Sequence, residues 1–122
     1  MELTPRLEVI KNCGLTSESG YEDLLLIVDI FKNDFDIELT EENAGVMITH
    51  LASAFKRIET GEAVNPLDSA LVEQIKMEPV YPLAQKIVDT VLSRIQNELS
   101  RDEQDFMLVH VGTLLCEREA EG

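Results

Sequence analysis

A chain of 122 residues, 44% of them hydrophobic and none of them tryptophan, predicts one domain with an aliphatic core. Its 24 acidic and 10 basic residues give a formal net charge of −14, which argues against direct binding to nucleic acid or to an anionic membrane surface. The sequence contains neither the pattern of a signal peptide nor an apolar run of membrane-spanning length, so we expect a cytoplasmic protein.

Capping residues mark the first two predicted helices. Thr4 and the proline after it predict the start of a short N-terminal helix, and Gly14 predicts its end. Ser19 and Glu22 have the spacing of a capping box and predict the start of a second helix. The expected apolar stripes contain Leu7, Ile10 and Cys13 in the first helix, and Leu24, Leu25, Val28 and Phe31 in the second.

The third predicted helix runs from Thr40 to about Glu59, and Gly61 is expected to end it. His50 lies about 100° from the centre of its apolar stripe, at the boundary between core and solvent. Arg57 follows seven residues later on the same face of the helix. The stripe itself contains Ala44, Met47, Ile48, Leu51, Ala54, Phe55 and Ile58.

Three more helices are predicted in the C-terminal half, joined by short loops. Asn65 and Pro66 predict the start of the fourth, Pro82 that of the fifth, and Ser100 that of a sixth helix that ends near Arg118. The expected buried residues are Leu67, Leu71 and Ile75 in the fourth, Ala84, Ile87, Val88, Val91, Leu92 and Ile95 in the fifth, and Phe106, Met107, Val111 and Leu114 in the sixth. These elements predict an all-α helical bundle.

Both histidines of the chain lie in apolar helical runs. Neutral imidazole is a nucleophile near pH 7, because the ordinary pKa of histidine is about 6.5. At a boundary position, one ring nitrogen of His50 is reachable while the other can be held, and Arg57 could bind an added phosphate. The same spacing also suits an inert helix surface held by salt bridges. His110 is more typical of a core histidine with satisfied hydrogen bonds.

Other chemistry has little support in the sequence. The two cysteines and two histidines are scattered along the chain and do not supply a zinc site. The sequence contains no phosphate-binding loop, so we expect no cofactor. Cys13 and Cys116 are expected to be reduced and mostly buried, although a disulfide or a Cys116–histidine pair stays open. The acids Asp102, Glu103 and Asp105 are expected to complement the N-terminal end of the sixth helix dipole.

Three segments, in order and with the right spacing, resemble the PTS regulation domain, or PRD. In THLASAFKRIETGE, His50 and Arg57 match the first histidine segment of that family, while Thr49 replaces the usual acid. NPLDSALVEQIK resembles the Asn-Pro-Leu segment that follows. The run from Tyr81 to Gly112 resembles the rest, with Asp105 in place of a glycine. Its matching residues are Tyr81, Ala84, Asp102, Glu103, Phe106 and His110.

The resemblance implies five core helices in residues 20–118, preceded by an extension with a short helix in residues 1–19 and followed by a frayed tail in residues 119–122. Known regulators of this family join the PRD to a DNA- or RNA-binding domain, for which an acidic chain of 122 residues leaves no space, so we expect a stand-alone regulatory module. We also expect that it is not an enzyme and needs no cofactor. His50 and His110 are the candidate phosphoacceptors, and Arg57 is the supporting cation.

The expected phosphate donor is HPr or a sugar-permease component. Dimerisation and a transcription regulator as partner are also implied, whereas direct contact with nucleic acid or a membrane is not expected. The alternative is a non-phosphorylated scaffold for interaction or dimerisation with a PRD fold, which Thr49 and Asp105 favour because they depart from the family pattern.

Overall fold

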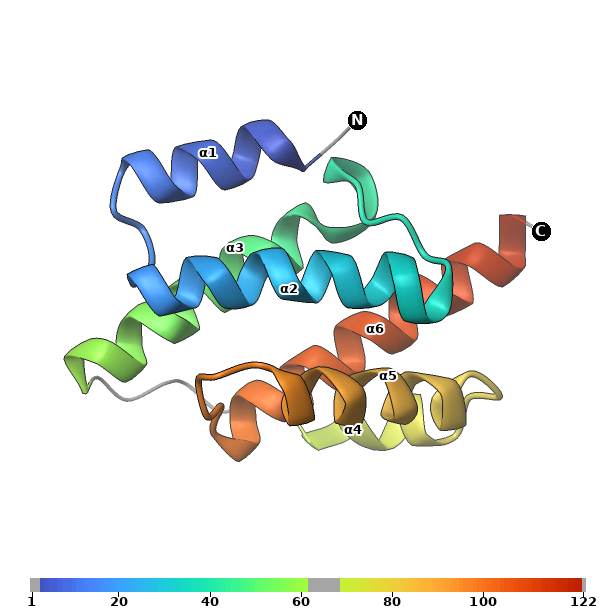
Figure 1. Cartoon of the computed structure of the whole chain (residues 1–122). Coiled ribbons are helices and arrows are strands. Elements are labelled where there is room, and N and C mark those ends of the chain that lie inside the picture. The colour runs from blue at the N-terminus through green and yellow to red at the C-terminus, as the bar shows by residue number, and fades with distance from the viewer. Residues whose placement is uncertain (1–2, 62–68, 122) are drawn as a thin grey trace.

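The structure, a computed structural model, describes residues 3–61 and 69–121, and these residues form six helices (Figure 1). The helices are α1 (Thr4–Asn12), α2 (Glu18–Phe35), α3 (Glu41–Thr60), α4 (Ser69–Lys76), α5 (Tyr81–Arg94) and α6 (Arg101–Glu121). The predicted all-α helical bundle is therefore confirmed. The division into five core helices and one short extra helix is wrong, because α1 is longer than α4 and buries Leu7 and Ile10 in the common core, together with its N-cap residue Leu3.

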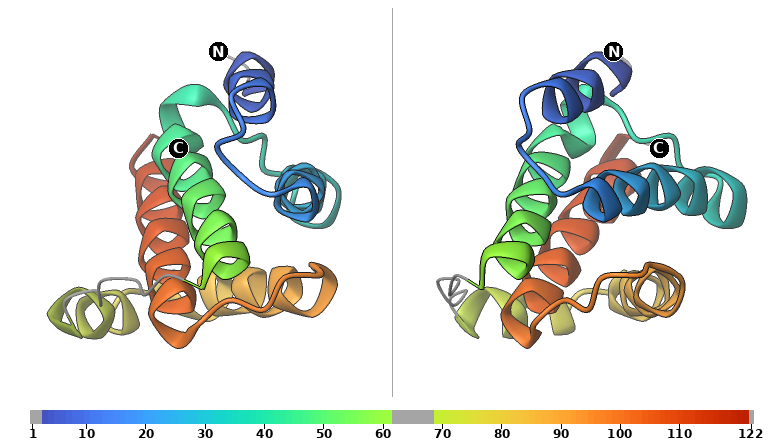
Figure 2. Two further views of the ribbon diagram at one scale, coloured as in Figure 1. Left: turned by 90° about the vertical axis from the view of Figure 1, so that its left-hand side faces the viewer. Right: turned by 60° about the vertical axis from the view of Figure 1, so that its left-hand side comes forward.

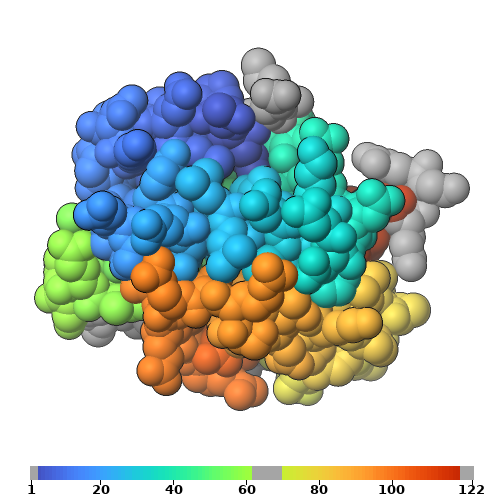
Figure 3. All heavy atoms as spheres, in the orientation of Figure 1, coloured from blue at the N-terminus to red at the C-terminus, as the bar shows by residue number. Residues whose placement is uncertain are grey.

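Two helices organise the packing of the others. α2 contacts α1, α3 and α5, and α6 contacts α3, α4 and α5. Figure 2 shows α3 and α6 side by side and running in opposite directions, with α4 and α5 crossing one end of this pair. Side chains of α1, α2 and α5 form a continuous surface on the face seen in Figure 3. The bundle thus has an antiparallel α3–α6 pair at its centre.

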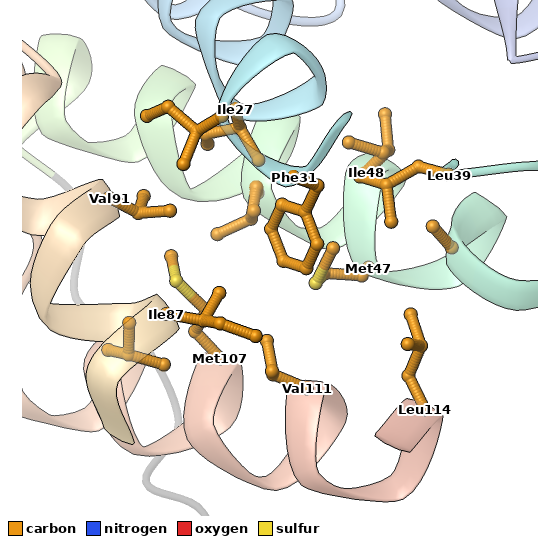
Figure 4. Close-up of a cluster of buried hydrophobic side chains, with 14 of the residues drawn as sticks. Ile27, Phe31, Leu39, Met47, Ile48, Ile87, Val91, Met107, Val111 and Leu114 are labelled. Carbon is orange, nitrogen blue, oxygen red and sulfur yellow. The ribbon is translucent and has the colours of Figure 1, made fainter. Parts of the chain in front are cut away.

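The core lies where α2, α3, α5 and α6 meet (Figure 4). Phe31 from α2 is fully buried and lies near Met47 of α3. Ile87 and Val91 approach from α5, and Met107, Val111 and Leu114 from α6. The core is aliphatic, as the sequence predicts.

The apolar stripes are only partly as expected. Leu25, Ile58 and Leu71 are exposed, so their predicted burial is wrong. In α2 the run of three leucines allows more than one helical phase, and packing selects the phase that buries Leu24, Ile27, Ile30 and Phe31. Cys13 is also exposed, because it lies just beyond the end of α1, while Cys116 is half-buried.

Helix ends follow local capping chemistry, with two corrections. Thr40 caps α3 in a full capping box with Asn43, and Gly61 ends α3 in the left-handed conformation, both in agreement with the prediction. The N-cap of α2 is Ser17 rather than Ser19, since the Ser17 hydroxyl accepts from the backbone N–H of Gly20 at 3.0 Å. In α1 the N-cap is Leu3, and Thr4 is the first helical residue.

Asp23 fixes the connection that leads into α6. Its carboxylate, which is only 2% exposed, accepts from the backbone N–H groups of Gln96 and Asn97 at 3.0 and 2.9 Å. The Asn97 side-chain amide donates a third hydrogen bond at 2.7 Å. A single buried acid on α2 therefore determines where the α5–α6 connection is held.

Some expectations fall at the margins of the described residues. The expected start of α4 at Asn65 and Pro66, together with Leu67, lies outside them, as does Gly122 of the expected tail. α6 continues to Glu121, past the expected end near Arg118. The proposed boundaries at residues 1–19, 20–118 and 119–122 stay predictions.

Candidate functional site

The antiparallel α3–α6 pair brings the two expected acceptor histidines to one face. His50, at the middle of α3, and Arg57, near its C-terminal end, lie beside the first turns of α6. His110, farther along α6, lies beside the first turns of α3, where it lines a hollow with Glu42 and Val46. Residues far apart along the chain thereby form one row across the two helices.

Glu103 holds the His50 ring. Oε2 of Glu103 lies 2.9 Å from Nε2 of His50, and Glu103 is only 5% exposed whereas the His50 side chain is 30% exposed. An ionised carboxylate only accepts hydrogen bonds, so the Nε2–H group is the donor. The contact fixes the tautomer and the orientation of an imidazole at the edge of the core.

Arg57 approaches the same carboxylate from the other side. Its guanidinium Nη1 lies 3.8 Å from Oε1 of Glu103, and its side chain is 32% exposed. The predicted shared face of His50 and Arg57 is therefore confirmed, since both residues reach Glu103. Arg57 is present at the site as the sequence predicts, and in this structure its ion-pair partner is Glu103.

Phe106 contacts both histidines. Its ring stacks on His50 with a centroid distance of 3.6 Å and an interplanar angle of 15°. Its centroid also lies 5.7 Å from that of the His110 ring, which is tilted by 34°. The two imidazoles therefore share one aromatic neighbour on α6.

His110 is half-buried, and within the described residues neither of its ring nitrogens has a hydrogen-bond partner. His110 therefore lies at the edge of the core rather than inside it, and the expectation that its hydrogen bonds are satisfied stays a prediction. It lines a hollow of about 210 Å³ whose wall also contains Glu42, Val46, Thr113 and Glu117. Burial lowers the pKa of His110, the nearby His50 lowers it further, and Glu117 opposes the shift.

Both residues that depart from the PRD pattern have partners in the structure. Thr49 Oγ1 accepts a hydrogen bond of 2.7 Å from Arg6 of α1, which also pairs with Glu41 at the start of α3. Oδ1 of Asp105 lies 3.4 Å from Nε of Arg101, which is one turn earlier in α6. Neither side chain bonds directly to a histidine ring among the described residues.

Glu103 is the site residue whose role the sequence analysis missed. It was expected to complement the helix dipole, and its backbone N–H does donate a capping hydrogen bond to the Ser100 hydroxyl at 3.3 Å. Its side chain, however, lies on the buried stripe of α6, four residues before Met107 and seven before His110. An acid at a stripe position is the signal that could have identified it, because a buried carboxylate requires a partner.

The arrangement suits nucleophilic chemistry at a histidine better than metal binding. No group of three or more His, Cys, Asp or Glu side chains in residues 3–61 and 69–121 is placed to hold a metal ion. None of the helices in these ranges combines the length and apolar character needed to cross a membrane. The chemically distinct feature is a half-exposed imidazole that is held by a buried carboxylate beside an arginine.

Comparison with known proteins decides the family. The family model of the PRD domain matches residues 26–114, a segment that includes His50, Arg57, Glu103 and His110. The chain belongs to the PRD family. PRD domains are regulatory modules, so the resemblance stated from the sequence is confirmed at the level of the family.

Two bacterial proteins are similar to this PRD protein. It is 20% identical to the uncharacterized protein YhfY of Escherichia coli (strain K12), over 87% of this chain and 88% of that protein. It is 22% identical to an uncharacterized protein of Haemophilus influenzae, over 98% of this chain and 95% of that protein. Both relatives are thus close to this PRD protein in length. No solved structure matches it.

Proposed function

We propose that this PRD protein is a cytoplasmic regulatory module of the sugar phosphotransferase system, in which His50 accepts a phosphoryl group. The observation that carries the proposal is the His50–Glu103–Arg57 cluster. It presents an imidazole that is oriented by a buried acid and reachable from solvent, with a guanidinium beside it. HPr or a sugar-permease component is the proposed donor, and no catalytic role is assigned to the protein itself.

Electrostatics favour His50 over His110 as the main acceptor. A phosphoryl group adds a charge of about −1.5 to −2 and binds best near a cation, and Arg57 lies at the His50 site. The hollow around His110 contains Glu42 and Glu117, which repel a dianion. His110 therefore remains the second candidate acceptor.

The added charge would change how α3 meets α6. Arg57 would then have two anions within reach, the phosphoryl group and Glu103, and any shift toward the phosphoryl group weakens its ion pair across the two helices. We propose that this change is read by a protein partner, such as a transcription regulator or a second copy of this chain.

A phosphotransfer assay tests the proposal. The purified protein is incubated with phosphoenolpyruvate, Enzyme I and HPr, with and without sugar-permease components, and protein-bound phosphate that is acid-labile and alkali-stable is measured. We expect label in the parent protein and in His110→Ala, and its loss in His50→Ala. Mixtures without HPr provide the control, and a parent protein that stays unlabelled with every donor contradicts the proposal.

The second candidate function is a scaffold that carries no phosphate. It is favoured by the fact that Glu103, which holds His50, already pairs with Arg57, and that Thr49 beside His50 in the sequence already binds Arg6. A scaffold predicts that His50→Gln alters stability or partner binding and that no donor labels the parent protein. The same assay, combined with pull-down of partners by both proteins, distinguishes the two functions.

A further inference from the structure

The ring of His50 offers its two nitrogens to very different surroundings. Nε2 is engaged with Glu103 at 2.9 Å, and one face of the ring is covered by Phe106 at a centroid distance of 3.6 Å. Nδ1 has no hydrogen-bond partner within the described residues. Among the described residues, Thr16 Oγ1 is the only side-chain polar atom that is both fully buried and without a hydrogen-bond partner. Since Nδ1 of His50 also lacks a partner, it cannot be fully buried and must contact solvent.

The carboxylate also determines where the lone pair of the neutral ring lies. Because Glu103 can only accept, the proton resides on Nε2 and the lone pair on Nδ1. A carboxylate that holds one nitrogen of an imidazole in this way leaves the other as the nucleophile or base. The reachable nitrogen and the nucleophilic nitrogen of His50 are therefore the same atom.

We propose that Glu103 is a positioning residue that holds His50 in the Nε2–H tautomer and thereby directs the phosphoryl group to Nδ1. The inference rests on the proposed function of His50 as phosphoacceptor. It adds the atom that is modified and the residue that selects it.

The transfer step balances without a further reactant. The Nδ1 lone pair attacks the phosphorus of a phosphorylated imidazole on the donor protein, and a new P–N bond forms. The P–N bond of the donor breaks, and its electron pair returns to the donor nitrogen. Nε2 keeps its proton, so the phosphorylated ring is cationic, and the Glu103 carboxylate lies against its N–H group.

Attack by Nε2 is disfavoured by the same geometry. It would require the Nε2–H proton to leave and the Glu103 contact to break. It would also place a dianionic group against a carboxylate that is almost completely buried. Glu103 thus acts on the choice of nitrogen both by holding the proton and by repelling charge.

The first test determines the tautomer before any phosphate is added. Long-range proton–nitrogen NMR of the His110→Ala protein reports which ring nitrogen of His50 carries the proton near neutral pH. We expect the Nε2–H form to dominate in this protein. Its share should fall when Glu103→Gln is added to His110→Ala, because the glutamine amide can also donate to an unprotonated Nε2. A dominant Nδ1–H form in the first protein overturns the inference.

The second test identifies the phosphorylated nitrogen. The same two proteins are phosphorylated by phosphoenolpyruvate, Enzyme I and HPr, and also by potassium phosphoramidate. Antibodies specific for the two phosphohistidine isomers and phosphorus NMR then identify the product. We expect the Nδ1 isomer in the protein that retains Glu103, and at least a several-fold shift toward the Nε2 isomer in the Glu103→Gln protein.

The outcomes separate this inference from the proposed function. An Nε2 isomer in the protein with Glu103, or an isomer ratio unchanged by Glu103→Gln, overturns the role of Glu103 while leaving His50 as an acceptor. Label from phosphoramidate but none from the protein donors counts against the proposed function, and the isomer formed still decides the role of Glu103. His50→Ala labelled by phosphoramidate is the matched control. It reports the isomer ratio at His110, which has no hydrogen bond to a carboxylate among the described residues.

Discussion

Oε2 of Glu103 lies 2.9 Å from Nε2 of His50, although the two residues are 53 positions apart in the sequence. This contact joins α3 to the first turn of α6 and is stabilised further by Arg57 at 3.8 Å. It links the stability of the bundle to the residues of the candidate site. Four predictions test this contact and other interactions that the packing creates.

Glu103→Ala should destabilise the protein more than the loss of a helix-dipole interaction does. The substitution leaves the ring N–H of His50 and the guanidinium of Arg57 without their acceptor, so we expect the free energy of unfolding to fall by about 1–3 kcal/mol. Asp102→Ala, in the same first turn, is the matched control and should cost less than about 1 kcal/mol. Urea denaturation measures both, and equal losses would mean that Glu103 acts only on the dipole.

Protonation of His110 should destabilise the fold at mildly acidic pH. Burial lowers the pKa of His110 in the folded protein, whereas the unfolded chain has the ordinary value near 6.5. As pH falls through 6.5 toward the lowered pKa, the unfolded state binds a proton that the folded state does not, so stability decreases. His110→Gln should therefore lose less stability than the parent between about pH 7.5 and 5.5. Identical pH profiles in urea denaturation contradict this prediction.

Asp23→Ala should destabilise the α5–α6 connection. The change removes the acceptor for the backbone N–H groups of Gln96 and Asn97. We therefore expect the free energy of unfolding to fall by about 1–3 kcal/mol. Asp29→Ala, at an exposed position of the same helix, should change it by no more than about 0.5 kcal/mol. Hydrogen exchange at the amides of Gln96 and Asn97 should accelerate only in the first variant.

Gly20→Ala should destabilise the protein even though alanine favours helix. A Cβ atom at Gly20 would lie 2.6 Å from Cβ of Phe55 and 2.5 Å from Oγ1 of Thr16, and atoms so close to the backbone cannot easily move. We expect a loss of about 1–3 kcal/mol. Gly45→Ala is the control, since its new Cβ would meet only the flexible Arg6 side chain at 3.2 Å. Thermal unfolding should show a lower midpoint for the first variant than for the second.

Sequence reasoning was most reliable where the interactions are local. It predicted the all-α bundle, the cap of α3 at Thr40 and the left-handed end of that helix at Gly61. It also placed His50 at the boundary of the core and on one face with Arg57, because helical periodicity alone determines both properties. The PRD resemblance came from short motifs whose spacing is visible in the sequence, and the family comparison confirmed it.

Packing between helices decided what periodicity left open. In α2, apolar residues occupy more than one face, and only contact with α3 and α5 selected Ile27 and Ile30 over Leu25 for burial. In α6, Glu103 resembled one of several acids near a helix start until α3 supplied His50 and Arg57 as partners. Likewise, the stacking of Phe106 on His50 depends on the alignment of two antiparallel helices.

The sequence by itself thus determined where helices begin, which faces are apolar and which family the chain resembles, since these depend on residues a few positions apart. The tertiary structure decided which nitrogen of His50 is held, which cation lies near Glu103 and which aromatic ring stacks on His50. The reason is physical. These contacts join residues dozens of positions apart, and their geometry exists only after α3 and α6 have packed against each other.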